Sequence, residues 1–531
     1  ANNTAVGFQA LTSNTTGTKN VAVGSSALDA NTTSNSNVAV GYQALTSSVT
    51  GSGNTAVGTE SLKSNTANHN VAVGSAALQD NTSGQYNVAV GSSALANNTT
   101  ATRNTAMGYN TLGANTTGGN NTAVGYAALD ANTSGHNNTA VGDGTLSAAT
   151  TASYNTALGR SALNVNTTGS YNTALGGLSM DANTDGVNNA AVGYNSMGAN
   201  TSGQSNAALG KEALHQNTTG NFNTGVGAEA LKRNTTGSQN TAVGRFALDH
   251  NTTAPSNVAV GTNALTANTT GGYNVAVGVN ALDANTTAAN NTAVGYNVLG
   301  ANTTGADNAA FGHNALSSSA TNYYCSAFGS GALRDSTANN NSAFGYLASH
   351  LNTTGAGNTS VGSQAARYNT SGGNNTAIGN EALKVNTTGQ RNTAVGSLAL
   401  DANTTAGENT AVGYATLSAN TTGTKNVAIG VRALDANTTG FYNIAIGTDA
   451  LGVETAGAGN VAVGYQCLDA CTTASNNIGV GQGALGAATT GYRNVAIGQS
   501  AGDTINVGYN NICIGYNADT DTAARFNSIT I

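Results

Sequence analysis

The most regularly spaced reactive side chains in this chain are aspartates. Four of them, Asp401, Asp435, Asp469 and Asp503, recur at one constant interval. A file of carboxylates could bind calcium, which takes six to eight oxygen ligands. The Gly-Gly-x-Gly-x-Asp pattern of calcium-binding β-rolls does not occur. The sequence therefore favours exposed, solubilising carboxylates over a metal site.

The histidines and cysteines show no comparable order. The six histidines, which we expect to be solvated surface residues without metal-ligand spacing, are His69, His136, His215, His250, His313 and His350. Four cysteines, Cys325, Cys467, Cys471 and Cys513, are too few for a disulfide framework. Cys467 and Cys471 could pair locally, but the sequence favours isolated small residues.

Clusters of charged residues that could perform catalysis are also missing from the sequence. A polysaccharide-cleaving site on a β-helix needs Asp, Lys and Arg close together, whereas the 16 Lys and Arg residues are scattered. We therefore predict that the protein is not an enzyme and has no catalytic residues, no metal and no cofactor.

These side chains are carried by one repeated unit. An Asn opening the motif N-[TV]-A-[VI]-G recurs from Asn3 to Asn527 every 17 residues. The exceptions are 16-residue units that begin at Asn54, Cys325 and Asn511. The consensus, numbered here as positions 1 to 17, is N-[TV]-A-[VI]-G-x-x-A-L-x-A-N-T-T-G-x-x. The pattern predicts a single continuous array over residues 1–531, with degenerate terminal coils over 495–531.

A single unit has too few large apolar side chains to offset an ordering entropy of about 1–2 kcal/mol per residue. Stacked units can share one interior, as repeat proteins do. We therefore predict a repeat solenoid of about 31 coils. It would be a parallel β-solenoid or β-roll, with coils about 4.8 Å apart.

The first third of the unit is expected to form a short strand. Because side chains alternate along a strand, positions 2 and 4 should face the core and Ala at position 3 should point away. Val124 and Val243 are therefore candidate core residues. Position 5 is always Gly, which indicates a positive φ or a close backbone contact that excludes a Cβ. Gly7, Gly125, Gly244 and Gly379 represent this position.

The remainder of the unit should reverse the chain. Positions 6 to 11 contain good helix formers, so we favour a one-turn helix over a second short strand. Either element would place Leu129 and Leu248, at position 9, in the core. The N-T-T-G segment has turn chemistry. Asn at position 1, such as Asn121 and Asn240, and Asn at position 12 should form side-chain amide ladders.

Tyrosine or threonine side chains aligned from coil to coil indicate an alternative function, the binding of a glycan or of ice. Tyrosine recurs with interruptions at position 6, in Tyr42, Tyr109, Tyr126, Tyr194, Tyr296, Tyr346, Tyr414, Tyr465 and Tyr516. An ice-binding face needs two threonines on one side, as in T-x-T. Thr235 and Thr236 are adjacent and would diverge if extended, and threonine at position 2 is expected to face inward.

The repeats resemble those of known fibrous proteins. N-[TV]-A-[VI]-G is similar to the S-V-A-I-G head repeats of trimeric autotransporter adhesins, whose family fold is a left-handed parallel β-roll of three chains. The longer form, with GYQAL at Gly41–Leu45 and NTTG at Asn14–Gly17, resembles repeats of phage tail-fibre proteins and bacterial surface proteins. The resemblance covers essentially the whole chain and implies a homotrimer or a filament. The 17-residue unit is longer than the adhesin unit.

Composition narrows the function further. Charged residues make up only 7% of the chain and the net charge is −7, so the basic surface of a nucleic-acid-binding protein is not expected. No apolar run approaches the roughly 20 residues of a membrane span. We predict a structural fibre or filament protein that is extracellular, on a cell surface or in a virion fibre. Its expected partners are copies of itself and a cell-surface or glycan receptor.

Overall fold

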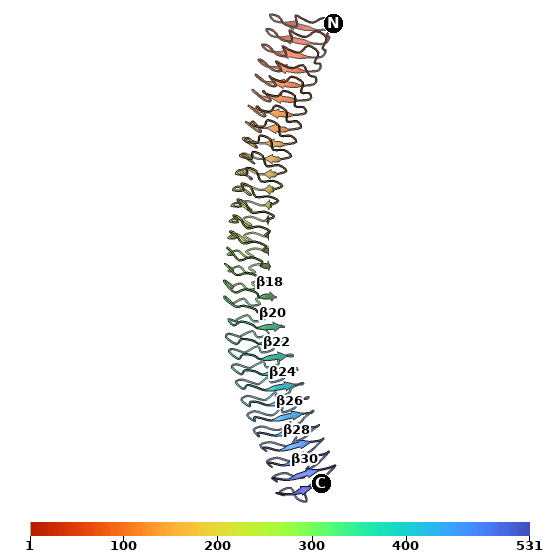
Figure 1. Ribbon diagram of the computed structural model, residues 1–531, viewed down its shortest axis with the longest axis vertical. Helices are drawn as coiled ribbons and strands as arrows, with labels where there is room; N and C mark the ends of the chain where they lie inside the picture. The colour runs from red at the N-terminus through yellow and green to blue at the C-terminus, as the bar shows by residue number, and fades with distance from the viewer. Residues whose placement is uncertain (1) are drawn as a thin grey trace. The chain divides into compact units, whose positions relative to one another are not determined.

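The computed structural model describes residues 2–531. The chain forms two compact units, Ala1–Thr270 and Gly271–Ile531. Within each unit the chain winds as a parallel β-solenoid with one short strand in each 17-residue coil, and the chain has about 31 coils (Figure 1). The residues described contain no helix. The predicted parallel β-solenoid is thus confirmed.

The strands of the first unit all begin at position 2 of the repeat. They are β1 (Thr4–Val6), β2 (Val21–Val23), β3 (Val38–Val40), β4 (Thr55–Val57), β5 (Val71–Val73), β6 (Val88–Val90), β7 (Thr105–Met107), β8 (Thr122–Val124), β9 (Thr139–Val141), β10 (Thr156–Leu158), β11 (Thr173–Leu175), β12 (Ala190–Val192), β13 (Ala207–Leu209), β14 (Thr224–Val226), β15 (Thr241–Val243) and β16 (Val258–Val260).

The strands of the second unit also begin at position 2 as far as β31. They are β17 (Val275–Val277), β18 (Thr292–Val294), β19 (Ala309–Phe311), β20 (Ser326–Phe328), β21 (Ser342–Phe344), β22 (Thr359–Val361), β23 (Thr376–Ile378), β24 (Thr393–Val395), β25 (Thr410–Val412), β26 (Val427–Ile429), β27 (Ile444–Ile446), β28 (Val461–Val463), β29 (Ile478–Val480), β30 (Val495–Ile497), β31 (Ile512–Ile514) and β32 (Ile529–Thr530). Ile529 of β32 pairs with Ile512 at an interval of 17 residues, and the N–H of Ser528 donates to Asn511 Oδ1. Ser528 and not Asn527 therefore takes position 1 of the last coil, and the 16-residue unit predicted at Asn511 is wrong.

Equivalent residues of successive coils lie side by side. Strand β10 pairs in parallel with β11, so that Ala157 lies opposite Ala174 and Leu158 lies opposite Leu175. The backbone hydrogen bonds between coils keep the same register, because the N–H of Gly176 donates to the carbonyl of Leu158 at 2.8 Å. Each repeat position therefore becomes a file of like residues within its unit, as the repetition predicts.

The faces of the strand are the reverse of the expectation from sequence. Ala123 and Ala242, at position 3, have no exposed surface, whereas Val124 and Val243, at position 4, are half-buried. The same pattern, with position 3 buried and positions 2 and 4 more exposed, runs from β2 to β31. The reason is space, because the interior already holds Ala at position 8 and Leu at position 9 and leaves room only for a small side chain.

Positions 6 to 11 form neither the one-turn helix that the sequence favoured nor the alternative, a second strand. Residues at positions 7 and 9 adopt positive φ, as in Ala127 (49°) and Leu129 (54°), and the segment consists of turns. The N–H of Leu129 donates to the carbonyl of Thr145 in the next coil at 3.0 Å. Hydrogen bonds between coils thus replace those of a helix and hold Leu in the left-handed region, an uncommon conformation for this residue type.

Asparagine fills the interior opposite the leucine. At position 12 the amides bond directly to one another, as predicted, and Asn234 Nδ2 donates to Asn217 Oδ1 at 2.8 Å. At position 1 the predicted amide ladder forms in some coils only; Asn240 Nδ2, for example, donates to Asn223 Oδ1 at 3.2 Å. The Asn121 side chain instead has backbone partners. The N–H of Asn138 donates to Asn121 Oδ1, and Asn121 Nδ2 donates to the carbonyl of Gly135.

The amide file at position 12 breaks wherever Asn is replaced, and each break leaves a buried oxygen without a donor. These Oδ1 atoms belong to Asn31, Asn132, Asn302 and Asn437. One coil later, position 12 holds Ser48, Ala149, Ser319 and Glu454, respectively. Each Asn Oδ1 normally accepts from the next coil, so only the last amide of a run lacks its partner. The runs are therefore cooperative segments with defined ends.

Within residues 2–531, no helical segment has the length and apolar character needed to cross a bilayer.

Candidate interaction surface

The outward face of the sheet carries exposed apolar side chains in both units. Since positions 2 and 4 point outward, Val, Ile, Leu and Phe side chains form an external file instead of a core. Leu158 and Leu209 are each 51% exposed. Further position-4 side chains that are exposed include Val73, Met107, Val260, Phe344, Val361, Ile378, Ile429, Ile446, Val480, Ile497 and Ile514. Contiguous apolar surface of this kind commonly marks an interaction site.

Aromatic rings concentrate at one part of this face. Phe311, Phe328 and Phe344, on β19, β20 and β21, stack with ring centroids 4.6 and 4.9 Å apart. The residues beside them at position 2 are small, Ala309, Ser326 and Ser342 in the same three strands. On these three strands, stacked aromatic rings therefore lie beside small side chains.

The tyrosines at position 6 lie beyond the strand and are largely exposed. Tyr126 is 61% exposed and stacks on Tyr109 with centroids 5.5 Å apart. Tyr296 stacks in the same way on His313 at 5.4 Å. The other tyrosines of this file have no aromatic neighbour at position 6 in the coils next to them. At position 6 the described coils therefore hold pairs of rings and no continuous aromatic track.

The glycines at position 5 bring the backbones of neighbouring coils into contact. Gly7, Gly125, Gly244 and Gly379 have φ between 134° and 138°. A Cβ on Gly244 would lie 2.5 Å from the carbonyl oxygen of Gly261 in the next coil. Both conditions considered from the sequence, a positive φ and a missing Cβ, are therefore present at these residues.

The remaining structural residues proposed from sequence line the interior. Leu129 and Leu248 are fully buried, and so are Asn121 and Asn240. The N–H of Asn240 donates to Asn223 Oδ1 at 3.0 Å, and Asn240 Nδ2 donates to the carbonyl of Ala254 at 2.9 Å. Val124 and Val243 belong to the outward face instead.

The aspartates at position 10 are not the fully exposed carboxylates that the sequence favoured. Asp401, Asp435 and Asp469 are half-buried, whereas Asp503 is exposed. Burial is the main cause that raises the pKa of Asp401, since water is partly withdrawn from its charged form. Among residues 2–531, no three His, Cys, Asp or Glu side chains gather in a group that could hold a metal ion.

One histidine and all the cysteines lie inside. His350, expected at the surface, is only 8% exposed, and its Nδ1 lies 2.9 Å from the carbonyl oxygen of Gly331. The four cysteines are buried and free, so Cys467 and Cys471 do not pair. Burial raises the pKa of Cys467 to about 12, which makes this thiol a small, unreactive core residue.

A buried carboxyl group interrupts the asparagine file of the second unit. Glu454 occupies position 12 and has no exposed surface. One of its oxygens accepts the N–H groups of Ala456 and Gly457, and the other lies 2.8 Å from Cys471 Sγ. Burial, the dominant cause, raises the pKa of Glu454 above its usual value. Substitutions at position 12 were visible in the sequence, but this carboxyl–thiol contact was not anticipated.

Glu454 should make the stability of the second unit depend on pH. The pKa of Glu454 is higher in the folded than in the unfolded state. The carboxyl group therefore stabilises the fold fully when the pH is below its unfolded pKa of 4.5, and this stabilisation is lost as the pH rises through the folded pKa. We expect the melting temperature of the parent, relative to Glu454→Asn, to fall as the pH rises above 4.5. Circular dichroism at each pH measures this difference.

Glu381→Gln is the matched control, because Glu381 is half-buried and ion-paired with Lys384 at 3.0 Å. The difference between its melting temperature and that of the parent should change little over the same range. If the difference in melting temperature between the parent and Glu454→Asn did not change with pH, the raised pKa of Glu454 would be contradicted.

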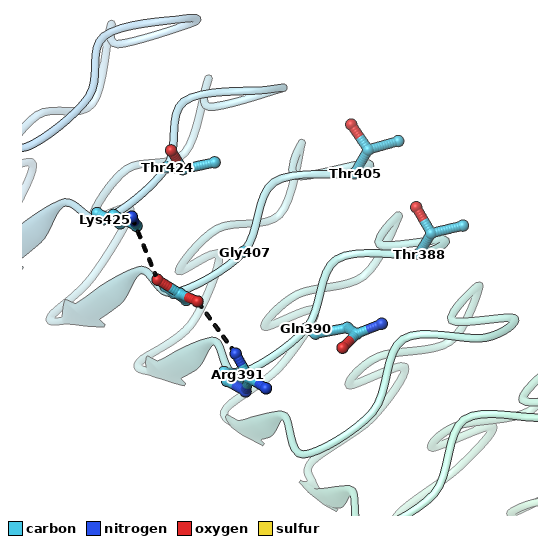
Figure 2. A pocket seen from close by; sticks show the side chains of 8 residues that line it. Thr388, Gln390, Arg391, Thr405, Gly407, Thr424 and Lys425 are labelled. Carbon is cyan, nitrogen blue, oxygen red and sulfur yellow. Dashed lines mark hydrogen bonds and ion pairs between the residues drawn. The ribbon is translucent and has the colours of Figure 1, made fainter.

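A polar groove lies on the second unit beside the sheet. It has a volume of about 320 Å³ and is lined by Thr388, Gln390, Arg391, Thr405, Gly407, Glu408, Thr424 and Lys425. These residues occupy positions 14, 16 and 17 of three successive coils. Gly407 stands where the coils on either side carry Gln390 and Thr424 (Figure 2). Gly407 therefore adds no side chain to the groove between these two residues.

Charged side chains form one wall of this groove. Glu408 lies between two cations, with Arg391 Nη1 at 3.1 Å and Lys425 Nζ at 3.9 Å (Figure 2). The hydrogen bond that Lys425 donates to Tyr442 is the main cause of a raised pKa for the ammonium group. Since Arg391, Glu408 and Lys425 are all substantially exposed, the ion pairs are weak individually and can exchange with a ligand.

The fold and its surfaces together define a parallel β-solenoid repeat protein with an apolar outward sheet face. Neither a scan against models of known protein families nor a comparison with curated proteins found a match for the chain.

Proposed function

We propose that the protein is a structural component of an extracellular fibre or filament, such as a surface filament, an adhesin rod or a tail-fibre shaft. The observation that carries this proposal is the external apolar file at position 4. A structural role also accords with the same coil being repeated along both units and with the lack of clustered charged groups in the sequence.

Self-association is the proposed use of the outward face. Burying apolar side chains contributes about 25 cal/mol for each Å² removed from water. A face made of one or two branched side chains per coil adds this contribution at every step of the stack. Copies of the same chain offer the same spacing, so their faces can align over many coils, either as a homotrimer or in a filament.

Electron microscopy of the purified protein tests the fibre directly. We expect elongated particles or filaments whose thickness exceeds that of one solenoid. Compact, isolated monomers at all concentrations would contradict both the fibre and the self-association.

The contact face can be tested by charge substitution. The double variant Leu158→Asp/Leu209→Asp places two carboxylates on the outward file, where they would have to be desolvated in an assembly. Because both side chains are already half exposed in the single chain, folding should be preserved. We expect the molar mass from light scattering to fall to that of the monomer, with an unchanged circular dichroism spectrum.

The matched control is Thr168→Asp/Thr219→Asp. Thr168 and Thr219 belong to the same two coils but lie in the N-T-T-G turns and are exposed. This variant should assemble like the parent. Equal assembly of both double variants would place the contact elsewhere and refute the role of the outward face.

A further inference from the structure

We infer that the groove around Gly407 is a binding site for a neutral carbohydrate, with room for about one pyranose ring. This site is separate in function from the apolar outward face. It would give a structural fibre a specific contact with a polysaccharide.

The shape of the groove comes from one small residue in a regular file. Coils above and below place Gln390 and Thr424 at position 16, and Gly407 between them has no side chain (Figure 2). The floor is backbone held by bonds between coils. The N–H of Glu408 donates to the carbonyl of Gln390 at 2.9 Å, and the N–H of Lys425 donates to the carbonyl of Gly407 at 3.3 Å. The site is therefore formed before a ligand arrives.

The lining selects a ligand with many hydroxyl groups. Three threonine hydroxyls, the Gln390 amide and the Glu408 carboxylate offer acceptors, and Arg391 and Lys425 offer charged donors. A sugar hydroxyl both donates and accepts, so it can use this mixture. Hydrogen bonds to charged groups are stronger than those between neutral groups. The threonine methyl groups supply the apolar contact that the edge of a sugar ring requires.

The same lining disfavours the other ligand classes. An apolar ligand would find no aromatic and no wholly aliphatic side chain among the lining residues. A phosphate or other anion would meet Glu408, which lies between the two cations and already pairs with both. A volume of 320 Å³ is at the lower end of the range for ligand pockets. Binding by one open groove should thus be weak, with multivalent display in a fibre raising the avidity.

Saturation-transfer NMR on the full chain tests the site. The probes are the methyl glycosides of glucose, galactose, mannose and N-acetylglucosamine at millimolar concentration, with inorganic phosphate tested separately through its phosphorus signal. We expect transfer from the protein to at least one glycoside. Glu408→Gln, which keeps the shape and removes the charge, should lower that transfer about tenfold.

Arg391→Ala should lower the transfer by a similar factor. Arg103→Ala is the control, since Arg103 occupies position 17 of a coil in the first unit, away from the groove. All three variants should keep the parent circular dichroism spectrum. No transfer to any glycoside, equal transfer in Glu408→Gln, Arg391→Ala and Arg103→Ala, or binding of phosphate alone would overturn the inference.

Discussion

Replacing Gly244 by Val is expected to destabilise the first unit by roughly 3 kcal/mol or more. The valine would have to hold φ near 134°, a conformation that β-branched residues almost never adopt. Its Cβ would also lie 2.5 Å from the carbonyl oxygen of Gly261. Since both coils are bonded to their neighbours in register, one of them must move out of the stack. Thermal unfolding followed by circular dichroism measures the loss.

The control for this variant is Gly177→Ala in the same unit. Gly177 lies at position 6, and a Cβ there would have its nearest neighbours at 3.9 Å. We expect little change in the melting temperature. If Gly244→Val melted and assembled like the parent, the close backbone contact at position 5 would not be a requirement of the fold.

Replacing Asn234 by Ala is expected to cost about 1–3 kcal/mol. Asn234 is fully buried in the middle of an amide run, between Asn217 and Asn251. The alanine would leave Asn217 Oδ1 in the interior without its donor at 2.8 Å. A buried acceptor without a partner loses its hydration and gains nothing in return. Chemical denaturation of the variant and the parent gives the difference in free energy of unfolding.

The same file offers a substitution in the opposite direction. Ala149 interrupts the run after Asn132, whose Oδ1 has no donor, and before Asn166. Ala149→Asn could donate to Asn132 and accept from Asn166, joining two runs. We expect a gain of about 1 kcal/mol. Thr236→Ala, in an exposed turn, is the control and should change stability little. A loss of stability in Ala149→Asn would show that amide bonding is not the reason for Asn at position 12.

The repetition of Asn, Gly and Leu was sufficient to predict the solenoid and its coil length. Gly244 illustrates why, because a residue that never changes in any coil reports a contact made by every coil. The amide bonding between Asn217 and Asn234 was predictable for the same reason. Stacking in register forces like residues together, so their chemistry can be deduced without coordinates.

The candidate sites were less predictable. The groove depends on Gly407 being flanked by Gln390 and Thr424, three residues at a position where the repeat has no consensus. The contact between Glu454 and Cys471 likewise joins two successive departures from Asn at position 12. Once the coil length is known, the sequence places these residues in adjacent coils, but it does not show whether their side chains lie in the interior or on the surface.

The sequence by itself determined that the chain stacks, at which interval, and which residues form files. Only the tertiary structure decided which side of the strand faces inward. Alternation along β8 divides Thr122 and Val124 from Ala123, and it is the same for either choice. The choice depends on the volume enclosed by the coil, which Leu129 and the buried asparagines nearly fill. The small alanine therefore lies inside, and the larger valine remains outside.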